Sequence, residues 1–300
     1  MNGRTHEAGR AVALIVTGYL IWGLLPLYWK LLSAVPSLEV LMHRILWSAV
    51  LSSSYFLLRR INPLRVLREI FHLHNPILLL ASAVVLALNW LSYVYAITSG
   101  HLLQASMGYF IAPMLTVFFG LLFFRERMNR LQAGAVILSG FGVVFTTFQA
   151  GEVPYLSLFI ALTFSLYTMC KKKIHLDGLK SLLADSLILL PAVLVYLAVL
   201  DVREASSFTL ADPLTCALLI ASGFATMIPL TLYINGAIRI EIKSVGFLQF
   251  ITPVMAFLLG VFVYREPLLV TDIVTFSFIL AGAGLYIRSV ISFHRVASEH

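Results

Sequence analysis

Residues 109–126, YFIAPMLTVFFGLLFFRE, form an apolar run of membrane-spanning length that contains a proline and ends in an Arg-Glu pair. Nearly the same pattern returns at residues 249–266, QFITPVMAFLLGVFVYRE. Pro113 and Pro253 occupy the same place in the two runs, and they are 140 positions apart (253 − 113). The chain is therefore predicted to consist of two related halves, each with one copy of this stretch.

Both prolines are predicted to act as hinges inside membrane-spanning helices. Proline has no backbone N–H, so it leaves the carbonyl four residues earlier without its usual donor and bends the helix. Pro113 would free the carbonyl of Tyr109, and Pro253 that of Gln249. Such a carbonyl is costly in lipid and must face another helix, a water or a cavity. A packing kink would explain one proline, whereas two equivalent prolines favour broken helices around a central pathway, as in secondary transporters.

The composition is that of an integral membrane protein. Hydrophobic residues make up 60% of the 300 positions and charged residues 12%, and the mean hydropathy is +0.94. So few charges cannot cover the surface of a soluble protein. The two cysteines, Cys170 and Cys216, lie in apolar runs and indicate neither a disulfide framework nor a zinc site. The net charge of +7 comes from basic residues in short loops, which is a topology signal and not a sign of nucleic-acid binding. No cofactor is predicted.

Ten segments approach or reach the roughly 20 residues needed to cross about 30 Å of hydrocarbon. The predicted fold is an all-α integral membrane protein with ten transmembrane helices in two inverted five-helix repeats, residues 1–149 and 150–300. The ten predicted spans are residues 11–32, 39–58, 77–98, 102–124, 131–149, 154–170, 179–200, 214–237, 242–264 and 270–291.

The distribution of Lys and Arg predicts the orientation. If the N-terminus is cytoplasmic, only Arg203 and Arg265 of the 21 Lys and Arg residues fall in outer loops, while Lys30 and Arg44 fall inside spans. This bias places both termini in the cytoplasm, in a multi-pass protein of a bacterial-type inner membrane. Because each half has five spans, the second half enters the membrane in the opposite sense. Inverted repeats of this kind are built for alternating access.

Several short motifs recur at fixed places along these spans. They are Trp22-Gly23, His43-Arg44, Asn89-Trp90, the run 108–113 with its counterpart 246–253, and Gly120, Glu126, Gly134 and Gly142. Together they resemble the EamA-like branch of the drug/metabolite transporter (DMT) superfamily, and within it the RarD group. The likeness covers nearly the whole chain and implies a transporter, but it implies little about the substrate. The second half departs from the first, with Ser165-Leu166 and Asp185-Ser186 near the places of Trp-Gly and His-Arg.

Three ionisable residues inside spans are functional candidates, because charges in lipid are costly. Arg44 either faces the pathway and binds an anionic or carbonyl group of the substrate, or snorkels to the outer headgroups. His43 titrates near neutral pH and could carry a coupling proton, or it is satisfied by a neighbouring helix. Asp185 aligns approximately with His43 and is the second candidate for proton coupling. Alternatively, Asp185 is an anchor paired with Lys180 or with a lysine of the run 171–173.

Uncharged polar and aromatic residues are predicted to line the substrate pathway. They are Asn89, Trp90, Tyr93, Gln104 and Tyr109 in the first half, and Tyr233, Asn235 and Gln249 in the second. Aromatic faces with a few amides suit amphipathic or aromatic solutes, since they pack apolar area while fixing orientation. The alternative is an interfacial aromatic belt.

The function predicted from the sequence is secondary transport of small organic solutes, driven by ion or solute gradients. The sequence has no HExxH, no G-x-S-x-G, no P-loop and no clustered carboxylate pair, so no enzyme is predicted. The alternative is a membrane scaffold or accessory subunit without transport of its own. A cavity lined by Asn89, Trp90, Gln104 and Gln249 would favour the transporter, and a tightly packed core the scaffold. Small residues in the fifth and tenth spans leave a homodimer contact open.

Overall fold

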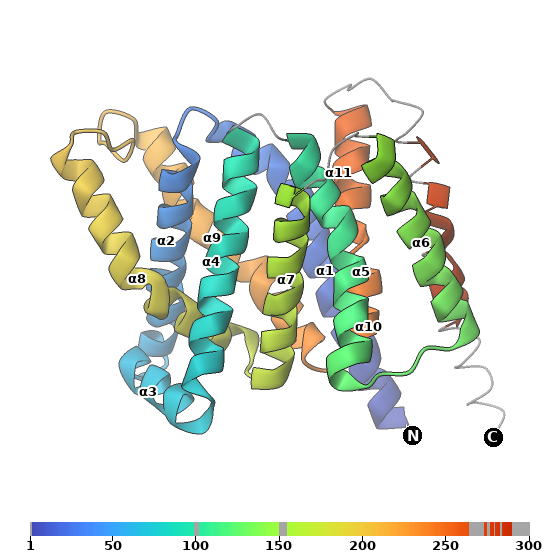
Figure 1. The fold of residues 1–300 in the computed structure, drawn as a ribbon. Coiled ribbons are helices and arrows are strands. Elements are labelled where there is room, and N and C mark those ends of the chain that lie inside the picture. Colours follow the sequence, from blue (N-terminus) through green and yellow to red (C-terminus); the bar gives the residue numbers. More distant parts are fainter. Residues whose placement is uncertain are drawn as a thin grey trace.

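The computed structural model describes the backbone of residues 2–98, 102–149, 155–263, 273–274, 277–278, 280–282 and 284–289. Within these ranges it does not describe the side chains of residues 2–6, 94, 96–98, 102–107, 110, 143, 146–147, 256–257 and 260–261. Eleven helices are labelled in this part of the chain (Figure 1). They are α1 (Asn2–Leu31), α2 (Ser37–Leu58), α3 (Pro63–Leu73), α4 (Pro76–Thr98), α5 (Leu102–Phe124), α6 (Arg130–Gln149), α7 (Tyr155–Ile174), α8 (Gly178–Val202), α9 (Pro213–Ala237), α10 (Ile242–Leu248) and α11 (Ile251–Phe262).

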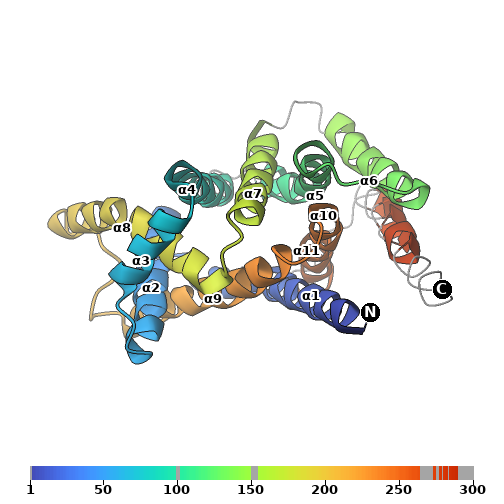
Figure 2. The same ribbon diagram turned by 90° about the horizontal axis from the view of Figure 1, so that it is seen from below.

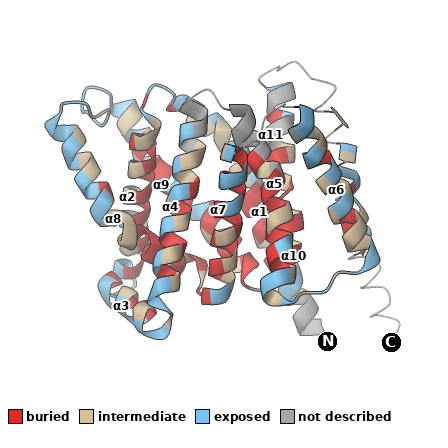
Figure 3. Ribbon diagram, in the orientation of Figure 1, coloured by how far each residue is buried: buried red, intermediate tan, exposed pale blue. Residues whose placement is uncertain are grey.

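Several helices have the length and apolarity of membrane spans. Four apolar stretches, Glu7–Leu31 of α1, Pro76–Tyr93 of α4, and the full lengths of α8 and α9, are long enough to cross a bilayer. Shorter apolar helical stretches lie at Ile111–Phe124 and Ile242–Met255. The outward-facing parts of the helices are largely exposed, and buried residues gather inside the bundle (Figure 3). The described part is thus an all-helical membrane protein, and ten spans in an inverted repeat remain a prediction.

The two halves of the chain pack against each other. Helices α1 and α2 of the first half contact α9, α2 also contacts α8, and α5 contacts α7 and α10. Seen from below, α4, α7 and α5 lie along one side of the molecule and α9 and α1 along the other (Figure 2). A cluster of aromatic rings lies in the interior and includes Tyr19, Trp22, Phe164, Tyr167 and Tyr233. The core is therefore shared between the halves.

A short amphipathic helix, α3, occupies a segment that the sequence predicts only as a loop. The side chain of Asn62 accepts the backbone N–H of Leu64 at 2.9 Å, and Pro63 occupies the first turn, so both helix-starting signals are present. Val66 and Ile70 are buried against the core formed with α2, α7 and α8. With 11 residues α3 is too short to cross a membrane, which is why a search for spans passes over it.

The predicted ninth span, residues 242–264, is broken into α10 and α11. The backbone turns at Gln249 and Phe250, shortly before Pro253. The carbonyl of Gln249 is not left open as the sequence suggested, because it accepts the N–H of Thr252 at 3.3 Å in a tighter, three-residue turn. Helix α5, by contrast, runs through Pro113 without interruption. The two equivalent prolines therefore have different local structures in this conformation.

The α8–α9 loop and the start of α9 are held by polar groups. Asp212 caps α9, and its carboxylate accepts the backbone N–H and the hydroxyl of Thr215 at 3.1 and 2.6 Å. These hydrogen bonds hold the pKa of Asp212 below its ordinary value. Glu39, in the first turn of α2, accepts hydrogen bonds from the Ser207 backbone and hydroxyl and from the hydroxyl of Ser206. The loop is thus tied across the end of the bundle where α2 begins.

Candidate functional site

Arg44 is buried between helices. Its side chain on α2 is 8% exposed, and its guanidinium carbon lies 4.6 Å from the ring centroids of both Trp29 and Trp90. Its Nε donates to the hydroxyl of Thr226 on α9 at 3.1 Å. The guanidinium group is therefore held by α1, α4 and α9, a geometry that does not fit snorkelling to the headgroups.

The charge of Arg44 has no counter-ion in the described part of the protein. None of the salt bridges there includes this residue. The hydroxyl groups of Tyr28, Tyr93 and Tyr109 are close enough to interact with it electrostatically, and the rings of Tyr93 and Tyr109 meet edge to face at 5.4 Å. Cation–π contacts contribute about 2 kcal/mol each when desolvated, while a buried ion costs several kcal/mol. The arrangement is suited to receiving an anion.

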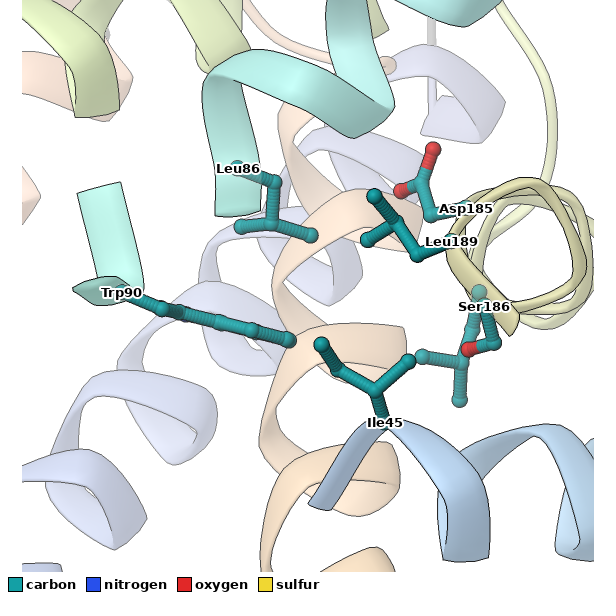
Figure 4. Close-up of a pocket in the computed structure, with 7 residues that line it drawn as sticks. Ile45, Leu86, Trp90, Asp185, Ser186 and Leu189 are labelled. Atoms are coloured by element: carbon teal, nitrogen blue, oxygen red, sulfur yellow. The ribbon is translucent and has the colours of Figure 1, made fainter. Parts of the chain in front are cut away.

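A narrow cavity adjoins this cluster. Its empty volume is about 180 Å³, and it lies between α2, α4 and α8, with Trp90 on one side and Asp185 and Ser186 on the other (Figure 4). The remaining lining residues are Ile45, Leu86, Leu182 and Leu189. That volume includes the gaps between atoms, and no part of it admits a water molecule. The cavity is therefore closed to solutes in this conformation and must open before it can hold one.

Asp185 belongs to a buried ion pair. One carboxylate oxygen accepts a hydrogen bond from Nζ of Lys171 at 2.8 Å and another from Ser82 at 3.3 Å. The second oxygen accepts the hydroxyl of Tyr167 at 3.2 Å. Lys180, the other predicted partner, instead pairs with Asp177 on the surface. Asp185 thus has a partner from the lysine run, which is the geometry expected for an anchor.

His43 does not share the contacts of Asp185. Its ring is buried and stacks on Phe208 of the α8–α9 loop, with centroids 5.0 Å apart. Neither ring nitrogen has a hydrogen-bond partner among the described residues, and the same holds for the indole N–H of Trp47 one turn further along α2. The two proton-coupling candidates therefore have different surroundings, although the predicted repeat aligns them approximately.

Gln249 takes part in a chain of hydrogen bonds at the break between α10 and α11. Its Oε1 accepts the hydroxyl of Thr116 on α5 at 3.2 Å, and that hydroxyl also lies 3.0 Å from Ser165 Oγ on α7. Ser165 in turn donates to the carbonyl of Ala112, next to Pro113, at 3.0 Å. Gln249 is thus connected to the backbone of α5 beside Pro113 and is not among the residues that line the cavity beside Trp90.

Other predicted pathway residues make helix–helix contacts. Asn89 donates to the carbonyl of Ile160 and the hydroxyl of Thr163 at 2.9 and 3.1 Å. Asn235 accepts the backbone N–H of Gly178 at 2.8 Å. The hydroxyl of Tyr233 lies 2.5 Å from that of Thr168. The side chain of Gln104 lies outside the described residues.

The structure thus brings Arg44, Trp90, Tyr93 and Tyr109 together and places Asn89, Tyr233, Asn235 and Gln249 in other contacts. Sequence reasoning missed Trp29 and Thr226. Trp29 stands near the end of a span, where an interfacial aromatic is common. Thr226 lies 182 positions from Arg44, so only the fold reveals this contact.

Comparison of the chain with known proteins shows the family to which it belongs. The EamA-like transporter family matches residues 9–148 and, a second time, residues 154–288. The chain therefore belongs to the EamA-like transporter family of the DMT superfamily, as its motifs predicted, and it is a membrane transporter by family.

Individual relatives agree with this assignment. The chain is 35% identical over 296 residues to the uncharacterized transporter YojE of Bacillus subtilis, covering 98% of this chain and 99% of that one. It is 34% identical over 299 residues to the protein RarD of Escherichia coli, covering 98% and 99%. A chloramphenicol-sensitive protein RarD of Pseudomonas aeruginosa is 28% identical over 262 residues, covering 86% and 87%. One solved crystal structure shares the fold with a TM-score of 0.70 at 17% identity, covering 92% and 96%.

Proposed function

We propose that this protein is a secondary transporter of small organic solutes that works by alternating access in a bacterial inner membrane. The proposal includes ten spans in two inverted repeats, residues 1–149 and 150–300, with both termini in the cytoplasm. Two matches to one family, at residues 9–148 and 154–288, support a repeat. The contacts of α1, α2 and α5 with helices of the second half support a pathway between the repeats.

The observation that carries the proposal is the burial of Arg44 without a counter-ion among the described residues. A structural arginine in a membrane interior is expected to pair with a carboxylate or with backbone carbonyls. Here two indoles and one hydroxyl surround it, and Trp90 also lines the adjoining cavity. A solute that brings an acceptor would complete the pairing, and Trp90, Tyr93 and Tyr109 would pack against its body. We therefore place the substrate site at these residues.

The flux of a labelled solute tests this proposal. The purified protein would be reconstituted in liposomes, and counterflow of radiolabelled chloramphenicol and of radiolabelled 3-phenylpropanoate would be measured. Chloramphenicol is chosen because of the name of the Pseudomonas relative. Trp90→Ala should lower the flux about ten- to hundredfold, the change expected for a loss of about 1–3 kcal/mol of contact. Leu91→Ala, at an exposed position on the same helix, is the matched control and should leave the flux unchanged.

We also propose that Asp185 couples the transport of the solute to the movement of a proton. A coupling carboxylate must exchange its pair with Lys171 for a proton during the cycle. The variant Lys171→Met with Asp185→Asn cannot titrate and leaves no unpaired charge. It should lose accumulation driven by a pH gradient while retaining solute exchange, which needs no net proton movement. Unchanged accumulation would leave His43 as the remaining candidate, or a facilitator without coupling.

A scaffold or accessory subunit without transport is the second candidate. The narrowness of the cavity and the fixed contacts of Asn89, Tyr233 and Asn235 favour it. Absence of counterflow for both probes, in liposomes that contain folded protein, would support this reading against the transporter.

A further inference from the structure

We infer that the site around Arg44 takes an organic monocarboxylate, a solute with one carboxylate, an apolar or aromatic body and no ammonium group. Transport of this solute rests on the proposed function, whereas its binding rests on the site alone. Three features of the surroundings of Arg44 decide which chemistry completes its pairing.

The first feature is the charge of the site. Arg44 carries one positive charge, and the other buried cation near the cavity, Lys171, is already neutralised by Asp185. One carboxylate would bring the site to neutrality. A phosphate dianion would leave a net negative charge in a desolvated interior, which costs several kcal/mol. The site therefore favours a monoanion over a dianion.

The second feature is the supply of donors. Nε of Arg44 is occupied by Thr226, and no described residue accepts a hydrogen bond from the two terminal amino groups. Two N–H groups of a guanidinium match the two oxygens of one carboxylate in a bidentate pair. The rings of Trp29 and Trp90 lie against the guanidinium itself, and Tyr93 and Tyr109 form an edge-to-face pair near it. The rest of the ligand is therefore expected to be apolar or aromatic.

The third feature is the lack of a partner for an ammonium group. Asp185 is the one carboxylate among the residues described as lining the cavity. Its oxygens already accept hydrogen bonds from Lys171, Ser82 and Tyr167. An amino acid would have to bury its ammonium group without an anion, or displace Lys171 from its pair. Both are costly, so the site favours a carboxylic acid over the corresponding amino acid.

Equilibrium binding to the purified full-length protein in lipid nanodiscs tests the inference. The probes are 3-phenylpropanoate, indole-3-acetate and octanoate, each compared with its neutral amide. Phenylalanine adds an ammonium group to the first probe, and phenyl phosphate presents a dianion on the same ring. At least one monocarboxylate should bind tenfold or more tightly than its amide, a difference of about 1.4 kcal/mol. 3-Phenylpropanoate should also bind more tightly than phenylalanine and phenyl phosphate.

A variant series assigns the binding to Arg44. Arg44→Gln should abolish the preference for the acid over the amide, and Arg44→Lys should keep part of it. Arg59→Gln, at an exposed arginine just after the same helix, is the control and should bind like the wild type. Trp fluorescence provides the readout, since Trp29 and Trp90 contact the guanidinium. If Arg44→Gln does not fold, the comparison of acids with amides on the wild type still decides the ligand class.

Several results would overturn the inference. Binding of no monocarboxylate, equal binding of acid and amide, or tighter binding of phenylalanine would each exclude the proposed ligand class. An acid preference that persists in folded Arg44→Gln would make Arg44 a structural brace. Counterflow in liposomes distinguishes a failure of the ligand class from a failure of the proposed function. Acid binding without flux refutes transport and supports the ligand class. Flux of chloramphenicol without acid binding supports transport and refutes the ligand class.

Discussion

The Nζ atom of Lys171 lies 2.8 Å from a carboxylate oxygen of Asp185, and the two side chains are only 1% and 2% exposed. Tyr167 and Ser82 donate further hydrogen bonds to the same carboxylate, so the pair connects α7, α8 and α4. A buried pair of this kind adds little stability over an apolar pair of the same size, but losing one partner leaves an uncompensated charge. Stability should therefore depend on the two residues together.

We predict that Asp185→Asn alone lowers the free energy of unfolding by about 3–5 kcal/mol, because it leaves Lys171 buried and unpaired. Adding Lys171→Met should recover most of this loss. Thermal unfolding of the single and double variants in detergent measures the coupling between the two residues. The control is Asp177→Asn, which breaks the exposed pair with Lys180 and should cost less than about 1 kcal/mol. A double variant no more stable than Asp185→Asn would contradict the prediction.

A second prediction concerns the start of α10. The carboxylate of Glu126 accepts the backbone N–H groups of Ile242 and Lys243 at 2.7 and 2.8 Å, so it caps a helix of the other half. Loss of a capping side chain costs about 0.5–2 kcal/mol. Glu126→Ala should therefore speed amide hydrogen exchange at Ile242 and Lys243 about two- to thirtyfold.

Glu69→Ala provides the control for this measurement, because Glu69 is exposed and pairs with Arg65 one turn away on α3. It should leave exchange in α10 unchanged. Equal exchange rates at Ile242 in wild type and Glu126→Ala would show that the cap does not stabilise α10.

Most of the fold could be predicted because apolar length is a strong signal. The predicted span 39–58 corresponds to α2 (Ser37–Leu58), and the span 179–200 corresponds to α8 (Gly178–Val202). The sequence predicted a break at the proline in both copies of the stretch, whereas the structure breaks the helix in the second copy, at Gln249 and Phe250, and not in α5. Pro253 and Pro113 have similar local sequences, so the difference between their two helices could not be predicted from the residues around them.

The site could be predicted only in part, for a related reason. Arg44 and Trp90 were found because polar and aromatic groups stand out inside apolar spans. Their neighbours Trp29 and Thr226 come from α1 and α9, and nothing in the local sequence links them to Arg44. Asn89 stood out equally, yet its amide is used to join α4 to α7. Residue type therefore identifies candidates, and long-range packing separates a ligand site from a helix contact.

A third prediction tests the close crossing of α1 and α11. A Cβ atom added to Gly23 would lie 2.4 Å from the Cβ of Met255, so one of the two helices would have to move. Overpacking of this kind costs about 1–3 kcal/mol. Gly23→Ala should therefore unfold at a lower temperature than the wild type. Gly9→Ala, in open space on the same helix, should be neutral or slightly stabilising, since alanine favours a helix. The opposite order of the two variants would exclude a tight crossing.

The last prediction tests the inverted repeat by labelling single cysteines with a membrane-impermeant thiol reagent in intact cells. Cys216→Ser is the background, and the buried Cys170 is kept. Cysteines at Gln149 and Leu210 should react from outside, because each follows an odd number of predicted spans; Leu210 is 98% exposed in the α8–α9 loop. A cysteine at Arg125 should react only after the cells are opened.

The decisive comparison is with a cysteine at Glu266, which lies outside the described residues but follows the second copy of the stretch that ends at Glu126. Five spans per repeat place these equivalent ends on opposite faces, so Glu266 should label from outside. Labelling of the Arg125 and Glu266 positions from the same side would refute the inverted repeat, whichever face the N-terminus occupies.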